Sequence, residues 1–156
     1  MAAKKMAIIA TKGALDMAYP PLILASTAAA LGWEVQVFFT FYGLQLLRKD
    51  LDHIQISPLA NPAMPMPVPM PVVVSVLPGM QAMATSMMKA KMKKKGVASL
   101  AELRDLCKEA DVKMIACQMT VDLFEFSKDD FIDGIEYGGA ATFLKFAGET
   151  DVCLFI

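Results

Sequence analysis

The residues of this chain with the most evident chemistry are its three cysteines, Cys107, Cys117 and Cys153. A cysteine thiolate is a nucleophile and a metal ligand. The cysteines are odd in number and show no Cys-x-x-Cys spacing, so we expect no disulfide framework. The chain has a single histidine, His53, and therefore too few soft ligands at short spacing for a structural zinc. We accordingly predict free thiols and no metal.

Cys117 ends a short apolar run, Val112–Ala116, and precedes polar residues that include Thr120 and Asp122. The run predicts a buried strand. Open α/β sheets react at the carboxyl ends of their strands, where backbone N–H groups and helix dipoles favour a thiolate. Most free cysteines are simply small buried hydrophobic residues. Position alone leaves both interpretations of Cys117 open.

The other two cysteines have positions that packing explains. Cys107 follows Leu100 and Leu103 at helical spacing, which predicts a buried thiol, although a role as a resolving thiol stays open. Cys153 alternates with its neighbours in a terminal strand, and we expect it to be packed because central strands are buried on both faces.

A turn after the first predicted strand, TKGALDMAYP, brings Thr11 and Lys12 to the same edge of the sheet as Cys117. These two residues are candidates for lining a site there. The turn is neither a Gly-x-Gly-x-x-Gly sequence nor a phosphate-binding P-loop, and it lacks the hydroxyl residues of a flavin-phosphate loop. We therefore expect no nucleotide or flavin cofactor.

The elements that must position these residues alternate along the chain. Strands are predicted by apolar, β-branched runs at residues 5–11, 34–40, 112–117 and 152–156. Helical patterns are predicted at residues 22–31, with Pro20 and Pro21 in the first turn, and at 41–51, 79–95, 99–110 and 139–147. Ser99 and Glu102 have the spacing of a capping box, and Ser127 to Asp130 predicts a further helix start. The fold expected is a single α/β domain over residues 1–156, with a parallel sheet of about four to five strands and helices on both faces.

An insertion at about residues 58–95 interrupts this alternation. Residues 58–78 hold seven of the nine prolines, which excludes a regular helix or a central strand. The following helix is expected to carry Met80, Met83 and Met87 on one stripe, either as a flexible docking face or as core. Residues 54–88 are uncharged and lysines follow, but prolines interrupt the only window long enough to cross a bilayer, so we do not favour membrane contact.

Composition limits the possible partners. The formal net charge is −1 and the pI is about 5.8, which gives no global electrostatic attraction to nucleic acid. Hydrophobic residues make up 56% of the chain, and this excess favours a homo-oligomer. The N-terminal sequence lacks the long apolar core and cleavage site of a secretory signal, so we expect a cytoplasmic protein.

Several segments together resemble the DsrE/DsrF-like family of small sulfur-relay proteins, in the branch often labelled peroxiredoxin-family: TKGALDMAYPPLILA, VFFTFYGLQLL, NPAMPMP, LPGMQAM, IACQMTVDLF and EYGGAATFL. The resemblance implies a flavodoxin-like fold, an oligomer of three or more subunits, and protein partners that donate and accept sulfur. It implies that Cys117 carries the sulfane sulfur. Cys107 is the only candidate for the second, upstream cysteine of this branch, and Thr11, Lys12 and Thr120 are candidates for the surrounding site.

Two other functions remain open at this point. One is a non-catalytic oligomeric subunit that binds partners through its methionine-rich face. The other is a thiol-dependent reductase. The peroxidase label of the branch finds no support, because the Pro-x-x-x-Thr-x-x-Cys sequence of those enzymes is absent. Whether the protein is an enzyme in its own right, such as a sulfurtransferase, also stays open.

Overall fold

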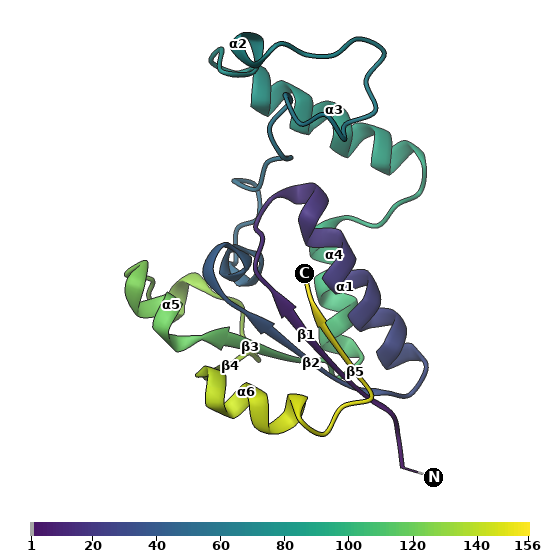
Figure 1. The fold of residues 1–156 in the computed structure, drawn as a ribbon, viewed down its shortest axis with the longest axis vertical. Helices are drawn as coiled ribbons and strands as arrows, with labels where there is room; N and C mark the ends of the chain where they lie inside the picture. Colours follow the sequence, from purple (N-terminus) through teal and green to yellow (C-terminus); the bar gives the residue numbers. More distant parts are fainter. Residues whose placement is uncertain (1) are drawn as a thin grey trace.

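A computed structural model describes residues 2–156 and contains one sheet of five parallel strands. The strands are β1 (Lys5–Ala10), β2 (Glu34–Phe39), β3 (Lys113–Cys117), β4 (Glu136–Gly138) and β5 (Val152–Phe155). Their order across the sheet is β4-β3-β2-β1-β5 (Figure 1). The predicted α/β fold with a parallel sheet is confirmed.

The centre of the sheet is built from residues that are apolar on both faces. In β1, Ile8 lies between Val37 of β2 and Leu154 of β5, and its side chain is fully buried. Strands buried on both faces are typically continuous apolar runs, which is why β1, β2 and β3 could be recognised from sequence.

Helices cover both faces of the sheet (Figure 1). The helices α1 (Leu15–Ala30) and α4 (Leu100–Glu109) pack together on one face, over the larger hydrophobic core. The helix α6 (Ala140–Ala147) covers part of the other face, where its Phe143 ring stacks on Phe38 with 5.0 Å between centroids. The connections from β1 to β2 and from β2 to β3, which contain α1 and α4, run in one direction across the sheet. The connection from β4 to β5, which contains α6, runs in the opposite direction. Because crossovers between parallel strands are right-handed, α6 lies on the opposite face from α1 and α4.

The first helix begins earlier than expected. The helix was predicted at residues 22–31 with Pro20 and Pro21 in its first turn, but it starts at Leu15 and holds both prolines in its interior. A proline inside a helix removes a backbone donor, which normally disfavours this arrangement. Here Leu15 and Tyr19 are buried in the core, so tertiary packing outweighs the local preference.

Several short elements surround the sheet. The predicted helix after β2 is a 3₁₀ helix, η1 (Phe41–Leu47), and the helix start at Ser127 leads only to a short 3₁₀ turn, η2 (Lys128–Asp130). The short helix α5 (Gln118–Leu123) follows β3 directly. The capping box of Ser99 and Glu102 is present, as predicted. Strand β4 was not predicted, because three residues carry too little periodicity.

Between β2 and β3 the chain leaves the sheet for a segment that contains α2 (Val72–Ser75) and α3 (Met80–Lys94), drawn at the top of Figure 1. The methionines of α3 divide between two faces. Met80, Met88 and Met92 pack against the core, whereas Met83 and Met87 are exposed. Within residues 2–156, none of the helices combines the length and the apolarity needed to cross a bilayer.

Candidate functional site

Cys117 lies at the carboxyl end of β3 and is also the N-cap residue of α5. Its side chain is 5% exposed and belongs to the smaller hydrophobic cluster, under α6. Its neighbours in that cluster are Ala7, Phe38, Ile115 and Phe143. The thiol is therefore nearly enclosed, at the edge of the sheet where α/β proteins place their reactive groups.

Two threonine hydroxyls lie close together at this edge. Thr40 follows β2, the neighbour of β3 in the sheet, and Thr120 lies in the first turn of α5. Their Oγ1 atoms are 3.3 Å apart. The backbone N–H of Phe41 donates to Thr120 Oγ1 at 3.1 Å, and the Thr120 side chain is fully buried.

These groups shift the acidity of Cys117. Burial by itself would raise the pKa of the Cys117 thiol, because a low-dielectric environment disfavours the charged form. Opposing it are the hydroxyl and N–H of Thr120, the hydroxyl of Thr40 and the N–H of Met119, which favour the thiolate. Together they hold the pKa of Cys117 below its ordinary value, so the site favours the nucleophilic form of the thiol.

The backbone that carries Thr40 is closely constrained. Phe41 has a φ of 48°, a left-handed conformation that is rare for a bulky residue. This conformation costs free energy and persists only where the surroundings impose it. Gly43 allows η1 to approach β1, since a Cβ at this position would overlap the backbone carbonyl of Ala10. The rings of Phe41 and Tyr42 contact Phe124, directly after α5, with centroid distances of 6.5 and 6.2 Å. Packing therefore fixes η1 against α5.

Cys107 is not brought to this site. It lies in the larger core, on the opposite face of the sheet from Cys117, with no exposed surface. Its thiol donates to the carbonyl of Leu22 at 3.4 Å. Burial raises the pKa of Cys107 to about 11, so this thiol is neutral at physiological pH. The geometry gives no support to Cys107 as a resolving thiol for Cys117.

Cys153 is exposed, and the prediction that it is packed was wrong. The prediction assumed a central strand, but β5 is an edge strand of the sheet. Val152 and Leu154 pack against the core, while Cys153 and Phe155 face outward on the other side of the strand.

The candidates Thr11 and Lys12 follow β1. The Thr11 hydroxyl donates to the carbonyl of Ile156 at 3.0 Å, which links the end of β1 to the end of β5. Lys12 is exposed and lines an open hollow together with Tyr42 and Gln45. Neither residue is among the groups that act on the Cys117 thiol.

Sequence reasoning named Thr120 but missed Thr40. The available signal was its position as the last residue of the predicted strand 34–40, next to the strand that ends in Cys117. Among residues 2–156 no three His, Cys, Asp or Glu side chains cluster closely enough to hold a metal ion.

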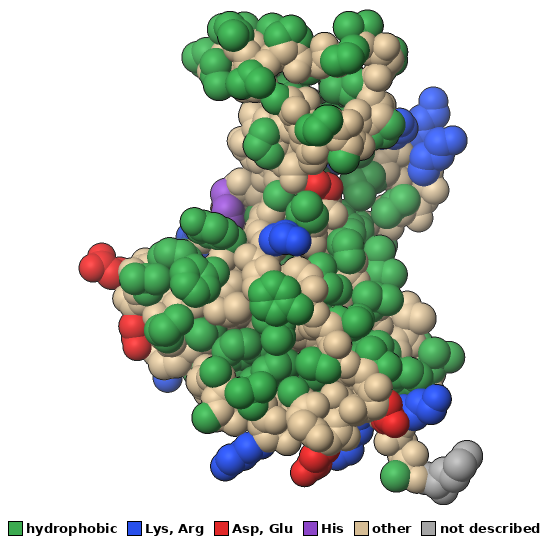
Figure 2. Space-filling view, viewed as in Figure 1, with side chains coloured by type: hydrophobic (Ala, Val, Ile, Leu, Met, Phe, Trp, Pro, Cys, Tyr) green, Lys and Arg blue, Asp and Glu red, His purple; other side chains and the backbone are tan. Residues whose placement is uncertain are grey.

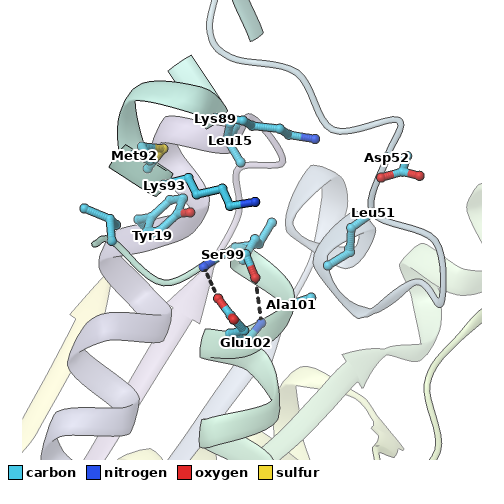
Figure 3. A pocket seen from close by; sticks show the side chains of 12 residues that line it. Leu15, Tyr19, Leu51, Asp52, Lys89, Met92, Lys93, Ser99, Ala101 and Glu102 are labelled. Atoms are coloured by element: carbon cyan, nitrogen blue, oxygen red, sulfur yellow. Dashed lines mark hydrogen bonds between the residues drawn. The ribbon is translucent and has the colours of Figure 1, made fainter. Parts of the chain in front are cut away.

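A separate cavity of about 420 Å³ lies between α3 and the body of the protein (Figure 3). Lys89 and Lys93 project from α3 over it, and the Ser99–Glu102 capping box forms its far wall. None of Cys117, Thr40 and Thr120 lines this cavity. It is therefore distinct from the thiol site.

Among the exposed hydrophobic side chains, two groups lie at the thiol site and over the segment between β2 and β3. Around the thiol site they are Tyr42, Met119 and Leu123, each more than half exposed. Over α2 and α3, at the top of Figure 2, they are Val68, Val72, Val73, Val76, Leu77, Met83 and Met87. Figure 2 also shows lysines beside the second group, where α3 ends.

Comparison with known proteins gives consistent results. Residues 2–155 match the model of a family described as DsrE/DsrF/DrsH-like. The chain is 68% identical to the sulfur carrier protein DsrE2 of Allochromatium vinosum over 160 aligned residues, which cover 100% of both chains. It is 33% identical to the uncharacterized protein YrkE of Bacillus subtilis over 157 residues, covering 98% of this chain and 97% of the relative. The crystal structure of the ychN protein from E. coli shares the fold, with a TM-score of 0.56 at 12% identity over 98% of this chain and 99% of the other.

Proposed function

The chain belongs to the DsrE/DsrF/DrsH-like family, and from this we propose that it is a sulfur carrier that accepts sulfane sulfur on Cys117. The relative from A. vinosum, 68% identical over its full length, is named a sulfur carrier protein. In this role the protein takes sulfur from a donor protein and passes it to the thiol of an acceptor protein.

Loading begins with the Cys117 thiolate, which attacks the outer sulfur of a donor persulfide, R–S–SH. A bond forms between Cys117 Sγ and that sulfur, the bond to the donor breaks, and the donor leaves as R–S⁻. The outer sulfur keeps its proton. The exchange moves one sulfur atom without net oxidation, so it requires no flavin, metal or nucleotide.

The observation that carries this proposal is the environment of Cys117. Of the three cysteines, it alone lies at the carboxyl edge of the sheet with hydrogen-bond donors that lower the thiol pKa. A thiolate is the form that attacks sulfane sulfur. Cys107 has a raised pKa and no access, and Cys153 lies on an edge strand.

Replacing the nucleophile tests the proposal. Cys117→Ser is expected to abolish loading from glutathione persulfide, seen as the loss of a mass gain of about 32 Da, and to keep the fold because no large cavity opens. Cys107→Ser and Cys153→Ser are matched controls that should still load. Undiminished loading in Cys117→Ser, or peptide mass spectrometry that places the sulfur on another cysteine, would contradict the proposal.

We further propose that the protein is a cytoplasmic homo-oligomer. Free thiols fit a reducing compartment, and the exposed apolar groups around Tyr42 and on α2 and α3 would be covered by neighbouring subunits or partners. Light scattering tests the oligomer: a constant mass near that of one chain, 16.9 kDa, at all concentrations would contradict it.

A partner-binding subunit without sulfur chemistry is the second candidate, and the exposed side chains of α2 and α3 favour it. The Cys117→Ser variant separates the two functions. A pure binding subunit would retain its complexes and its cellular role in this variant, whereas a sulfur carrier would retain only its complexes.

A further inference from the structure

We propose that Thr40 and Thr120 are positioning residues that act chiefly on sulfur release, by stabilising Cys117 as the leaving group. The inference rests on the proposed sulfur-carrier function and assigns separate effects to the loading and release steps. It is based on geometry and on where charge arises in each step. Phe39 pairs with Ala116, so the next residues, Thr40 and Cys117, lie side by side at the ends of β2 and β3. Thr120 Oγ1 lies 3.3 Å from Thr40 Oγ1.

The direction of the hydrogen bonds is set by the backbone. Because the Phe41 N–H donates to Thr120 Oγ1, that oxygen acts as an acceptor there and keeps its own proton available for donation. The Thr40 hydroxyl oxygen lies 3.3 Å from Thr120 Oγ1, and either hydroxyl can donate to the other. When Cys117 is neutral, one hydroxyl can donate to the other. When sulfur becomes charged, both protons can turn toward it, so neither state leaves a hydroxyl without a partner.

The pair is held in place before the reaction. Thr120 is fully buried, and Thr40 is joined to the left-handed Phe41 at the start of η1. Donors that are already oriented stabilise a developing charge without a cost of reorganisation at the moment of reaction. The local strain at Phe41 is consistent with a backbone constrained for this purpose.

Negative charge develops on Cys117 Sγ during release, whereas during loading the thiolate loses its charge. An acceptor thiolate attacks the outer sulfur of Cys117–S–SH, a new S–S bond forms, and the bond to Sγ breaks with its electron pair left on Sγ. The outer sulfur keeps its proton and leaves with the acceptor. Loading is the reverse for Sγ, which gives up its charge. Donors at Sγ therefore assist release, while a lower pKa also makes the thiolate a weaker nucleophile for loading.

The test measures acidity and the two transfer steps separately. In a Cys153→Ser background, the rate of iodoacetamide alkylation against pH reports the thiolate form of Cys117. Thr120→Val and Thr40→Val are expected to move this profile to higher pH and to slow release to dithiothreitol by about three-fold to ten-fold. Loading by glutathione persulfide, compared at equal thiolate fraction, should not slow.

Two kinds of control separate this role from structural support. Thr85→Val removes another buried hydroxyl, on α3, which bonds to Ile56 N and Gln81 O, and it should leave the alkylation profile unchanged. Thr120→Ser and Thr40→Ser keep the hydroxyl and should retain the original profile. If Thr120→Val does not fold, the partly buried Thr40 carries the test.

The outcomes distinguish this inference from the function on which it rests. Unaltered protein that takes up no sulfur would contradict the carrier function, and the release role with it. Protein that loads normally, with valine variants that release sulfur at the original rate, would overturn only the inference. An unchanged alkylation profile in both valine variants would overturn it too.

Discussion

Cys107 and Cys117 are both buried, yet their surroundings push their acidity in opposite directions. Burial raises the pKa of Cys107 to about 11, while the pKa of Cys117 lies below its ordinary value despite burial. Cys107 has an acceptor beside it, the Leu22 carbonyl, which suits a neutral thiol. Cys117 has donors around it, which suit a thiolate. The difference teaches that several hydrogen-bond donors together can outweigh burial in setting the acidity of a cysteine.

Selective alkylation is expected to show the largest difference between the two thiols. At pH 7.5 in the folded protein, Cys117 should react with iodoacetamide at least about 100-fold faster than Cys107. The pKa of Cys107 is raised to about 11 while that of Cys117 is lowered, and Cys107 is inaccessible. Peptide mass spectrometry over time measures both rates. Equal rates in a protein shown to be folded would remove the basis of the comparison.

Alkaline unfolding tests the Cys107 side of the comparison. The native state raises the pKa of Cys107 from 9.0 to about 11, so the unfolded chain loses this proton first. The stabilisation is complete below pH 9 and is lost as pH rises to 11, by about 2 to 3 kcal/mol. Urea unfolding between pH 8 and 11 should show this loss, and Cys107→Ala, lacking the group, should show a correspondingly flatter dependence. Identical slopes would contradict the raised pKa.

A substitution at the close contact between η1 and β1 is expected to give a smaller effect. Gly43→Ala places a methyl group against the Ala10 carbonyl and should lower the free energy of unfolding by about 2 kcal/mol while displacing Thr40. Gly139→Ala is the matched control, since its Cβ would meet no atom within 4 Å and its φ is −97°. Urea unfolding gives the stability, and the Cys117 alkylation profile gives the effect on the site. A Gly43→Ala protein as stable as the control would contradict the tight contact.

Much of the fold could be predicted because its central strands are apolar on both faces and because the capping box that begins α4 is formed by residues close together in sequence. The runs at β1, β2 and β3 need no partner to be recognised, and the Ser99–Glu102 capping box lies within four residues. The start of α1 was missed because burial of Leu15 outweighs the signal of two prolines. Strand β4 was missed because its pairing with β3 depends on residues distant in sequence.

The site was only partly predictable for a similar reason. Cys117 could be placed at a strand end from its own neighbours. The donor from Thr40 depends on β2 lying beside β3, which is a property of strand order rather than of local sequence. Cys153 was misjudged on the same ground, since nothing within VCLFI distinguishes an edge strand from a central one.

The exposed methionines have a consequence for how sulfur loading is recognised. Met83, Met87 and Met119 are each more than half exposed, and a thioether in contact with solvent is readily converted to its sulfoxide, with a gain of about 16 Da. Two such oxygens add about 32 Da, nearly the mass of one sulfur atom, so an aerobically aged protein imitates a loaded one. Dithiothreitol removes a persulfide sulfur but leaves a sulfoxide, whose reversal requires a dedicated reductase. The mass gain that disappears with a thiol is therefore the one that reports bound sulfur.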